Sequence, residues 1–146
     1  MRYGIFRRAF LKRDEKRLKQ VKSLKADVKA HHEFLVGKFW ELQNSPQYHV
    51  PTAKTVLLEE IDETAGRVQV CKFRQVTTKP KSDKSGGLRI IAAIFIGPEG
   101  PKKYVPILVY LAKEEGTSIS FNGKNYTLTK AGIIRLFKAR LESAAL

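Results

Sequence analysis

The chain has 146 residues, with 28 Lys and Arg against 14 Asp and Glu, which gives a formal net charge of +14. This length suits one domain with a real hydrophobic core, so we predict a single domain over residues 1–146. The excess of positive charge predicts an acidic partner, either nucleic acid, an acidic protein or anionic lipid. The hydrophobic content of 42% argues against a disordered chain.

The distribution of apolar residues argues against a membrane-spanning or secreted protein. No charge-free run approaches the about 20 residues of a membrane span, and a single cysteine cannot form an internal disulfide. Residues 1–16 are basic and aromatic and lack the apolar core of a secretory signal. We therefore predict a cytoplasmic protein without a membrane partner.

The first predicted helix covers residues 11–22. Leu11, Leu18 and Val21 recur there at helical spacing, so one face of the helix packs and the rest is strongly positive. The positive side is either a solvated surface or a surface that receives an anion.

A second predicted helix follows directly. Ser23 fits an N-cap, and Asp27 lies in the first turn, where the helix dipole favours an acid. We predict an antiparallel helical hairpin over 11–44. His31 and His32 lie in mid-helix with no cysteine or second ligand at metal spacing, so we predict no metal site.

The strand predicted at 68–76 carries its charges on one face. Cys71 and Phe73 alternate with Lys72 and Arg74, and alternate residues of a strand point to opposite faces. Two cations therefore project from the same side of the sheet.

A basic loop with two adjacent glycines leads into an apolar strand at 90–96. The lysines of this loop are Lys79, Lys81 and Lys84. Gly86 and Gly87 admit backbone angles that other residues resist and let another backbone approach closely. Arg89 then lies where a buried strand meets solvent, and its planar, permanently charged guanidinium is a good phosphate ligand there.

The rest of the chain predicts a third strand, a hairpin and a helix. Residues 104–112 form a strand antiparallel to the second, and Pro106 predicts an edge or bulge because it cannot donate a ladder hydrogen bond. Asn122-Gly123 indicates a tight hairpin turn. Thr129 caps a last helix. The packing side of that helix is Ile133, Ile134, Phe137 and Leu141.

These elements predict an α+β fold, with an N-terminal helical hairpin packed on a small, mainly antiparallel sheet and a C-terminal helix. Two segments are less regular. Residues 2–6 fit an edge strand, and residues 47–64 fit an irregular connector in which 56–58 could add a short buried piece.

A sheet face with Lys72, Arg74 and Arg89, near Lys113 at the end of the third strand, is an anion site by charge alone. Cleavage of RNA there needs charge stabilisation on the phosphoryl group, removal of the 2′-hydroxyl proton and protonation of the departing 5′-oxygen. Arginine and lysine meet the first need. For proton transfer the sequence leaves several alternatives open: Tyr126, Tyr110, Glu114 and a lysine with a lowered pKa.

Two sets of motifs resemble a known family. The first is Lys16-Arg17-Leu18 with Ser23-Leu24-Lys25 and Asp27, then a helix ending Leu42-Gln43-Asn44-Ser45-Pro46. The second, more specific set is Lys72-Phe73-Arg74, Lys84-Ser85-Gly86-Gly87-Leu88-Arg89-Ile90-Ile91 and Tyr110-Leu111-Ala112-Lys113-Glu114-Glu115. Together they resemble the RelE/HigB branch of the RelE/ParE superfamily of bacterial toxins.

The resemblance implies a RelE-like toxin of a type II toxin-antitoxin system. Such a toxin is a metal-independent endoribonuclease that needs no cofactor, acts on messenger RNA, often in the ribosome, and is silenced by a cognate antitoxin. The resemblance implies catalytic, phosphate-contacting roles for Arg74, Arg89 and Lys84. Supporting RNA-binding cations are then Lys72, Lys79, Lys81 and Lys113. Tyr126 takes the place of the histidine or tyrosine that several members carry in or after the last strand.

Two other functions fit the same fold. A ParE-like chain would inhibit DNA gyrase without using these cations for catalysis. A non-catalytic relic would bind nucleic acid only, and it is favoured because His31, His32 and His49 all precede the sheet. The oligomeric state of the free protein is left open.

Overall fold

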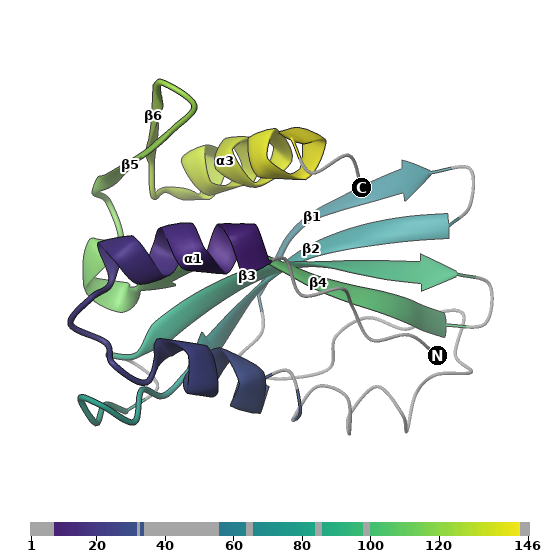
Figure 1. Ribbon diagram of the computed structural model, residues 1–146. Coiled ribbons are helices and arrows are strands. Elements are labelled where there is room, and N and C mark those ends of the chain that lie inside the picture. The colour runs from purple at the N-terminus through teal and green to yellow at the C-terminus, as the bar shows by residue number, and fades with distance from the viewer. Residues whose placement is uncertain are drawn as a thin grey trace.

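The computed structural model describes residues 8–31, 33, 56–63, 66–83, 86–97 and 100–143. They form an α+β fold, as predicted (Figure 1). The elements are α1 (Arg8–Arg17), a helical segment at 24–31, β1 (Val56–Glu63), β2 (Gly66–Gln75), β3 (Leu88–Gly97), β4 (Gly100–Leu111), the 3-10 turn η1 (Ala112–Glu114), β5 (Ser118–Phe121), β6 (Lys124–Thr127) and α3 (Lys130–Ser143). None of the described helices is long and apolar enough to cross a membrane.

The strands β1 to β4 form one antiparallel sheet in the order β1-β2-β3-β4. The three strands predicted at 68–76, 90–96 and 104–112 are thus confirmed. β1 differs from the prediction, because all of it lies in the segment at 47–64 expected to be an irregular connector with a short buried piece at 56–58. Its charged sequence, VLLEEIDE, has weak strand propensity. Antiparallel pairing with β2, which begins where Glu63 meets Gly66, supplies the ladder that local sequence does not indicate.

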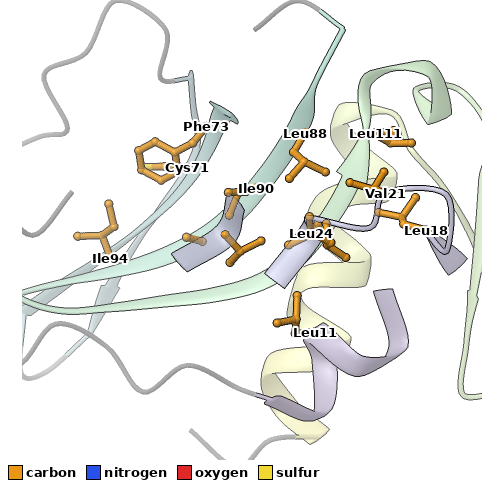
Figure 2. Close-up of a cluster of buried hydrophobic side chains, with 13 residues drawn as sticks. Leu11, Leu18, Val21, Leu24, Cys71, Phe73, Leu88, Ile90, Ile94 and Leu111 are labelled. Atoms are coloured by element: carbon orange, nitrogen blue, oxygen red, sulfur yellow. The ribbon is translucent and has the colours of Figure 1, made fainter. Parts of the chain in front are cut away.

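One face of the sheet packs against the N-terminal helices. Leu11, Leu18 and Val21, the predicted packing face, are all buried and join Leu24 and Val28 in one core cluster. Figure 2 shows Leu18, Val21 and Leu24 beside apolar side chains of the sheet. The sheet side chains of this cluster are Cys71, Phe73, Leu88, Ile90, Ala92, Ile94, Val109 and Leu111.

α1 ends earlier than predicted, at Arg17 rather than near residue 22. The backbone there turns, with Val21 N–H donating to the carbonyl of Leu18 at 2.9 Å. Lys22 N–H then donates to the carbonyl of Lys79 at 2.9 Å, so the chain leaves the helix to contact the β2–β3 loop.

The other face of the sheet packs against α3 and the β5–β6 hairpin. The predicted packing residues Ile133 and Phe137 are buried, and Leu136 joins them. The predicted cap is confirmed, since Thr129 Oγ1 accepts a hydrogen bond from Gly132 N–H at 3.3 Å. The predicted tight turn is also confirmed, because Asn122 and Gly123 both have positive φ, 48° and 79°.

β4 is an edge strand whose outer backbone groups bond to charged side chains. Asp14 of α1 accepts a hydrogen bond from Val109 N–H at 2.8 Å, while Arg17 donates to the Val109 carbonyl at 2.6 Å. Arg140 of α3 donates to the Ile107 carbonyl at 3.0 Å. The ladder between Ala92–Pro106 and Ile91–Leu108 skips Ile107, so the bulge and edge predicted from the proline are both present.

The same three charged residues join the two helices to each other. Asp14 is fully buried and contacts Arg17 at 2.7 Å and both terminal nitrogens of Arg140 at 3.1 Å. Arg17 also contacts Glu114 of η1 at 2.8 Å. We call Asp14, Arg17, Glu114 and Arg140 the Asp14 cluster. It holds α1 and α3 side by side in Figure 1.

Several predictions fall on residues outside the described ranges. They are the strand at 2–6, the end of the helical hairpin at 34–44, most of the connector at 47–55 and the catalytic Lys84.

Candidate anion-binding site

Three cations project from one face of the sheet. Lys72 and Arg74 alternate along β2, and the ladder places Arg89 of β3 directly opposite Arg74. Paired residues of an antiparallel sheet point to the same side. We call Lys72, Arg74 and Arg89 the cation face. The structure thus brings together three of the cations that the sequence assigned to one site.

Gly87 allows the end of β2 to lie close to the start of β3, where Arg89 is located. A Cβ atom on Gly87 would lie 2.3 Å from the carbonyl oxygen of Gln75, so only glycine allows the end of β2 to approach this closely. The Gly87 carbonyl also accepts a hydrogen bond from Ala112 N–H at 3.0 Å. The ends of β2 and β4 are therefore held beside the start of β3, as the predicted close approach required.

Two positive charges of the cation face, those of Arg74 and Arg89, repel each other. Burial lowers the pKa of Arg89, and the neighbouring Arg74 lowers it further, because the two guanidinium groups repel each other. Arg89 is 4% exposed, whereas Arg74 is exposed. A buried cation with a like charge beside it favours a bound anion.

Glu115 supplies one anion from within the chain. Its Oε1 lies 2.8 Å from Lys72 Nζ and 3.7 Å from Arg89 Nε. The hydrogen bond from Lys72 holds the pKa of Glu115 below its ordinary value of 4.5. Glu115 is therefore ionised at neutral pH, and the four side chains carry three positive charges and one negative charge.

Tyr110 of β4 completes the row across the sheet, opposite Arg89. Within the described residues its hydroxyl is buried and has no hydrogen-bond partner. Burial raises the pKa of Tyr110, and the negative charge of Glu115 raises it further. Lys72 Nζ lies 6.0 Å from the centre of the Tyr110 ring. Tyr110 thus keeps its proton and can donate a hydrogen bond to a ligand.

Neighbouring glutamates have different tasks. Glu114, an alternative for proton transfer, accepts hydrogen bonds from Leu111 N–H and from Arg17 Nε, both at 2.8 Å. These contacts hold η1 in place, and Glu115 is the glutamate that contacts the cation face. Sequence reasoning missed Glu115, and the only signal was its place in the Lys113-Glu114-Glu115 strand end.

Two of the predicted lysines, Lys79 and Lys81, lie in the described part of the β2–β3 loop. The exposed Lys79 has its backbone tied to the helical junction, with Lys79 N–H donating to Ser23 Oγ at 2.8 Å. Thr78 Oγ1 donates to Asp27 at 2.7 Å. Ser23 and Asp27 therefore dock the loop at the start of the second helix. Lys81 is exposed in the same loop and pairs with Thr78 in an isolated bridge.

Two further predicted residues lie near the edges of this arrangement. Lys113 is exposed on η1, two residues before Glu115. Tyr126 lies opposite Ile119 in the β5–β6 hairpin and packs, half-buried, against the second core cluster. No described contact joins Tyr126 to Arg74 or Arg89, so its catalytic role stays a prediction.

Among the described residues, no group of His, Cys, Asp and Glu side chains is placed to hold a metal ion. In comparisons with known proteins, no protein-family model, curated protein or solved structure matches the chain significantly. Fold and site together define a small basic α+β protein whose sheet carries Lys72, Arg74 and Arg89 on one face.

Proposed function

We propose that this protein is a RelE-like toxin that cleaves messenger RNA, with the cation face as its phosphate site. One observation carries the proposal: Lys72, Arg74 and Arg89 converge on one sheet face beside a buried tyrosine hydroxyl. The motif resemblance and the net charge of +14 support RNA as the anion.

In this reaction the RNA 2′-oxygen attacks the adjacent phosphorus and the bond from phosphorus to the 5′-oxygen breaks. The products are a 2′,3′-cyclic phosphate and a 5′-hydroxyl, so one proton leaves the 2′-hydroxyl and one reaches the 5′-oxygen. Arg74 and Arg89 would neutralise the charge that grows on the non-bridging oxygens. Lys72 adds a third positive charge, and Tyr110 adds a hydrogen-bond donor.

The test combines RNA cleavage with growth after induced expression. We expect the double variant Arg74→Ala with Arg89→Ala to lose cleavage by at least about 100-fold and to stop arresting growth. The matched control is Lys12→Ala with Lys29→Ala, which removes two charges from exposed positions on the N-terminal helices, and these pack on the opposite face of the sheet from the cation face. Cleavage should be measured on free RNA and on ribosome-bound messenger. Unchanged cleavage in the Arg74 and Arg89 double variant would reject the site.

A second candidate function is RNA binding without cleavage. It is favoured because the pKa of Tyr110 is raised and that of Glu115 is lowered, whereas general acids and bases work best with a pKa near the operating pH. Fluorescence anisotropy and gel analysis of the same labelled RNA separate the two functions. Salt-sensitive binding with intact RNA and normal growth supports the binding function.

The proposal includes an antitoxin with an acidic segment. A chain with this charge is best silenced by a partner of opposite charge that covers the cation face. We expect the product of an adjacent gene to co-purify with the wild-type chain. We expect high salt to weaken the complex, and Arg74→Ala with Arg89→Ala to weaken it further. A partner whose binding is insensitive to both changes would contradict this part of the proposal.

A further inference from the structure

The four residues Glu115, Lys72, Arg89 and Tyr110 differ in their exposure to solvent. The Glu115 side chain is 44% exposed, that of Lys72 is 21% exposed and that of Arg89 is 5% exposed. Tyr110 beneath them is fully buried. Glu115 is therefore the most exposed of these four residues, whereas Arg89 and Tyr110 are buried.

The backbone that carries Glu115 is fixed. Its N–H donates to the Ala112 carbonyl at 3.2 Å, and the next residue, Gly116, donates to the Leu128 carbonyl at 3.0 Å. Glu114 is held through its side chain to Arg17, as described above. The carboxylate of Glu115 can therefore leave Lys72 by side-chain rotation while the backbone stays in place.

The positions of these groups match the needs of an oxyanion. A carboxylate oxygen already accepts a hydrogen bond from Lys72 and lies within ion-pair distance of Arg89. A phosphate oxygen accepts the same two interactions and has further oxygens for other donors. The buried Tyr110 hydroxyl, with no partner among the described residues, is such a donor.

We propose that Lys72, Arg89 and Tyr110 form a phosphate-binding site. In the free protein the Glu115 carboxylate occupies this site, and a bound phosphate group displaces it. The identification of this phosphate as part of RNA rests on the function proposed above. The proposal that the site binds phosphate does not depend on that function. Glu115 then sets the affinity of the site, because each incoming anion must replace an existing ion pair.

The test uses inorganic phosphate as the probe and the full-length protein. Its dissociation constant is measured at low ionic strength from the NMR signal of the Arg89 Nε–H group, which is assigned with Arg89→Lys. We expect Glu115→Gln to tighten phosphate binding by about two- to fivefold, the range expected for removal of an exposed competing ion pair. The matched control is Glu142→Gln on α3, which removes the same charge from an exposed position.

A second variant tests the buried donor. Tyr110→Phe removes a hydroxyl that has no described partner, so folding should be retained. We expect it to weaken phosphate binding about threefold or more, most clearly in the Glu115→Gln background. Unchanged phosphate affinity in Glu115→Gln, or a gain equal to that of Glu142→Gln, would overturn the inference.

The two proposals can fail separately. If Glu115→Gln binds phosphate more tightly but neither protein cleaves RNA, the displacement holds and the nuclease function is wrong. If RNA cleavage depends on Arg74 and Arg89 but phosphate affinity does not respond to Glu115, the nuclease function holds and the displacement is wrong.

Discussion

Two charged clusters flank β4, and they differ in balance. In the Asp14 cluster, two guanidinium groups meet two carboxylates, and the central Asp14 and Arg140 are buried. At the cation face, the described ion pairs join Glu115, whose side chain is 44% exposed, to Lys72 and Arg89, and Arg74 lies opposite Arg89. Counting only these described side chains, the first cluster is neutral and buried at its centre, whereas the second has more positive than negative charges and lies partly at the surface.

The difference teaches that an arginine beside a strand is not by itself a binding site. Arg140 is as deeply buried against β4 as Arg89 is in β3, yet both of its terminal nitrogens already bond to Asp14. Arg89 shares one carboxylate with Lys72 and faces a second arginine. Among the described residues, the two arginines therefore differ in the charges around them rather than in their burial.

The largest expected effect is the loss of the closed cluster. Asp14→Ala would leave Arg140 buried without its carboxylate, so we expect a loss of about 3–5 kcal/mol in the free energy of unfolding. Urea denaturation followed by circular dichroism measures it. Asp14→Leu with Arg140→Met should recover much of the loss. A loss no greater than that of the exposed control Glu142→Ala would show that the cluster is not structural.

The next effect concerns the glycine at the cation face. We expect Gly87→Ala to cost about 1–3 kcal/mol, because its Cβ would lie 2.3 Å from the backbone oxygen of Gln75. Phosphate binding should weaken as well, since Arg89 would shift. The control is Gly86→Ala, where the nearest atom is the Asp83 carboxylate at 3.3 Å. Equal effects of the two substitutions on stability and binding would contradict the close-approach explanation.

A smaller effect is expected at the rim of the Asp14 cluster. Arg17→Ala removes contacts with Asp14, Glu114 and the Val109 carbonyl. The Arg17 side chain is 23% exposed, so we expect a loss of about 1–2 kcal/mol. Thermal unfolding measures it against the exposed neighbour Lys16→Ala. If Arg17→Ala also changed phosphate affinity, the loss of the Arg17–Glu114 contact would have shifted η1 and, with it, Glu115 at the cation face.

The smallest expected effect is a dependence of the melting temperature on pH that comes from the Glu115 ion pair at the cation face. The pKa of Glu115 is lowered by Lys72, so its ion pair stabilises the fold fully above the ordinary value of 4.5. That contribution disappears as the pH falls through the lower pKa of the folded protein. Relative to Glu115→Gln, the wild-type protein should therefore lose melting temperature on acidification below 4.5. Parallel pH profiles for the two proteins would show that the ion pair does not stabilise the fold.

Much of the fold could be predicted because its signals are local. Alternation in β2, the Asn122-Gly123 turn and the Thr129 cap each depend on neighbouring residues. β1 could not be predicted, since its strand character comes from pairing with β2. The link between Asp14 and Arg140 spans 126 positions in the chain, so no local pattern indicates it.

The candidate site could be predicted only in part. Strand alternation placed Lys72 and Arg74 together, and antiparallel pairing added Arg89. Glu114 and Glu115 are equivalent in the sequence, and only the contact with Arg17 shows which one is structural. The β2–β3 loop that carries Lys79 and Lys81 docks on Ser23 and Asp27, far away in the chain, so no local pattern indicates where these lysines lie.

The side-chain bonds along β4 have a consequence for assembly. A protein that recognises this sheet by adding a strand needs free backbone N–H and C=O groups along an edge. The N–H and C=O groups of Val109 and the C=O group of Ile107 are already bonded to Asp14, Arg17 and Arg140. This stretch of β4 is therefore closed to strand addition, either by a partner or by a second copy. The closure also protects it from edge-to-edge aggregation.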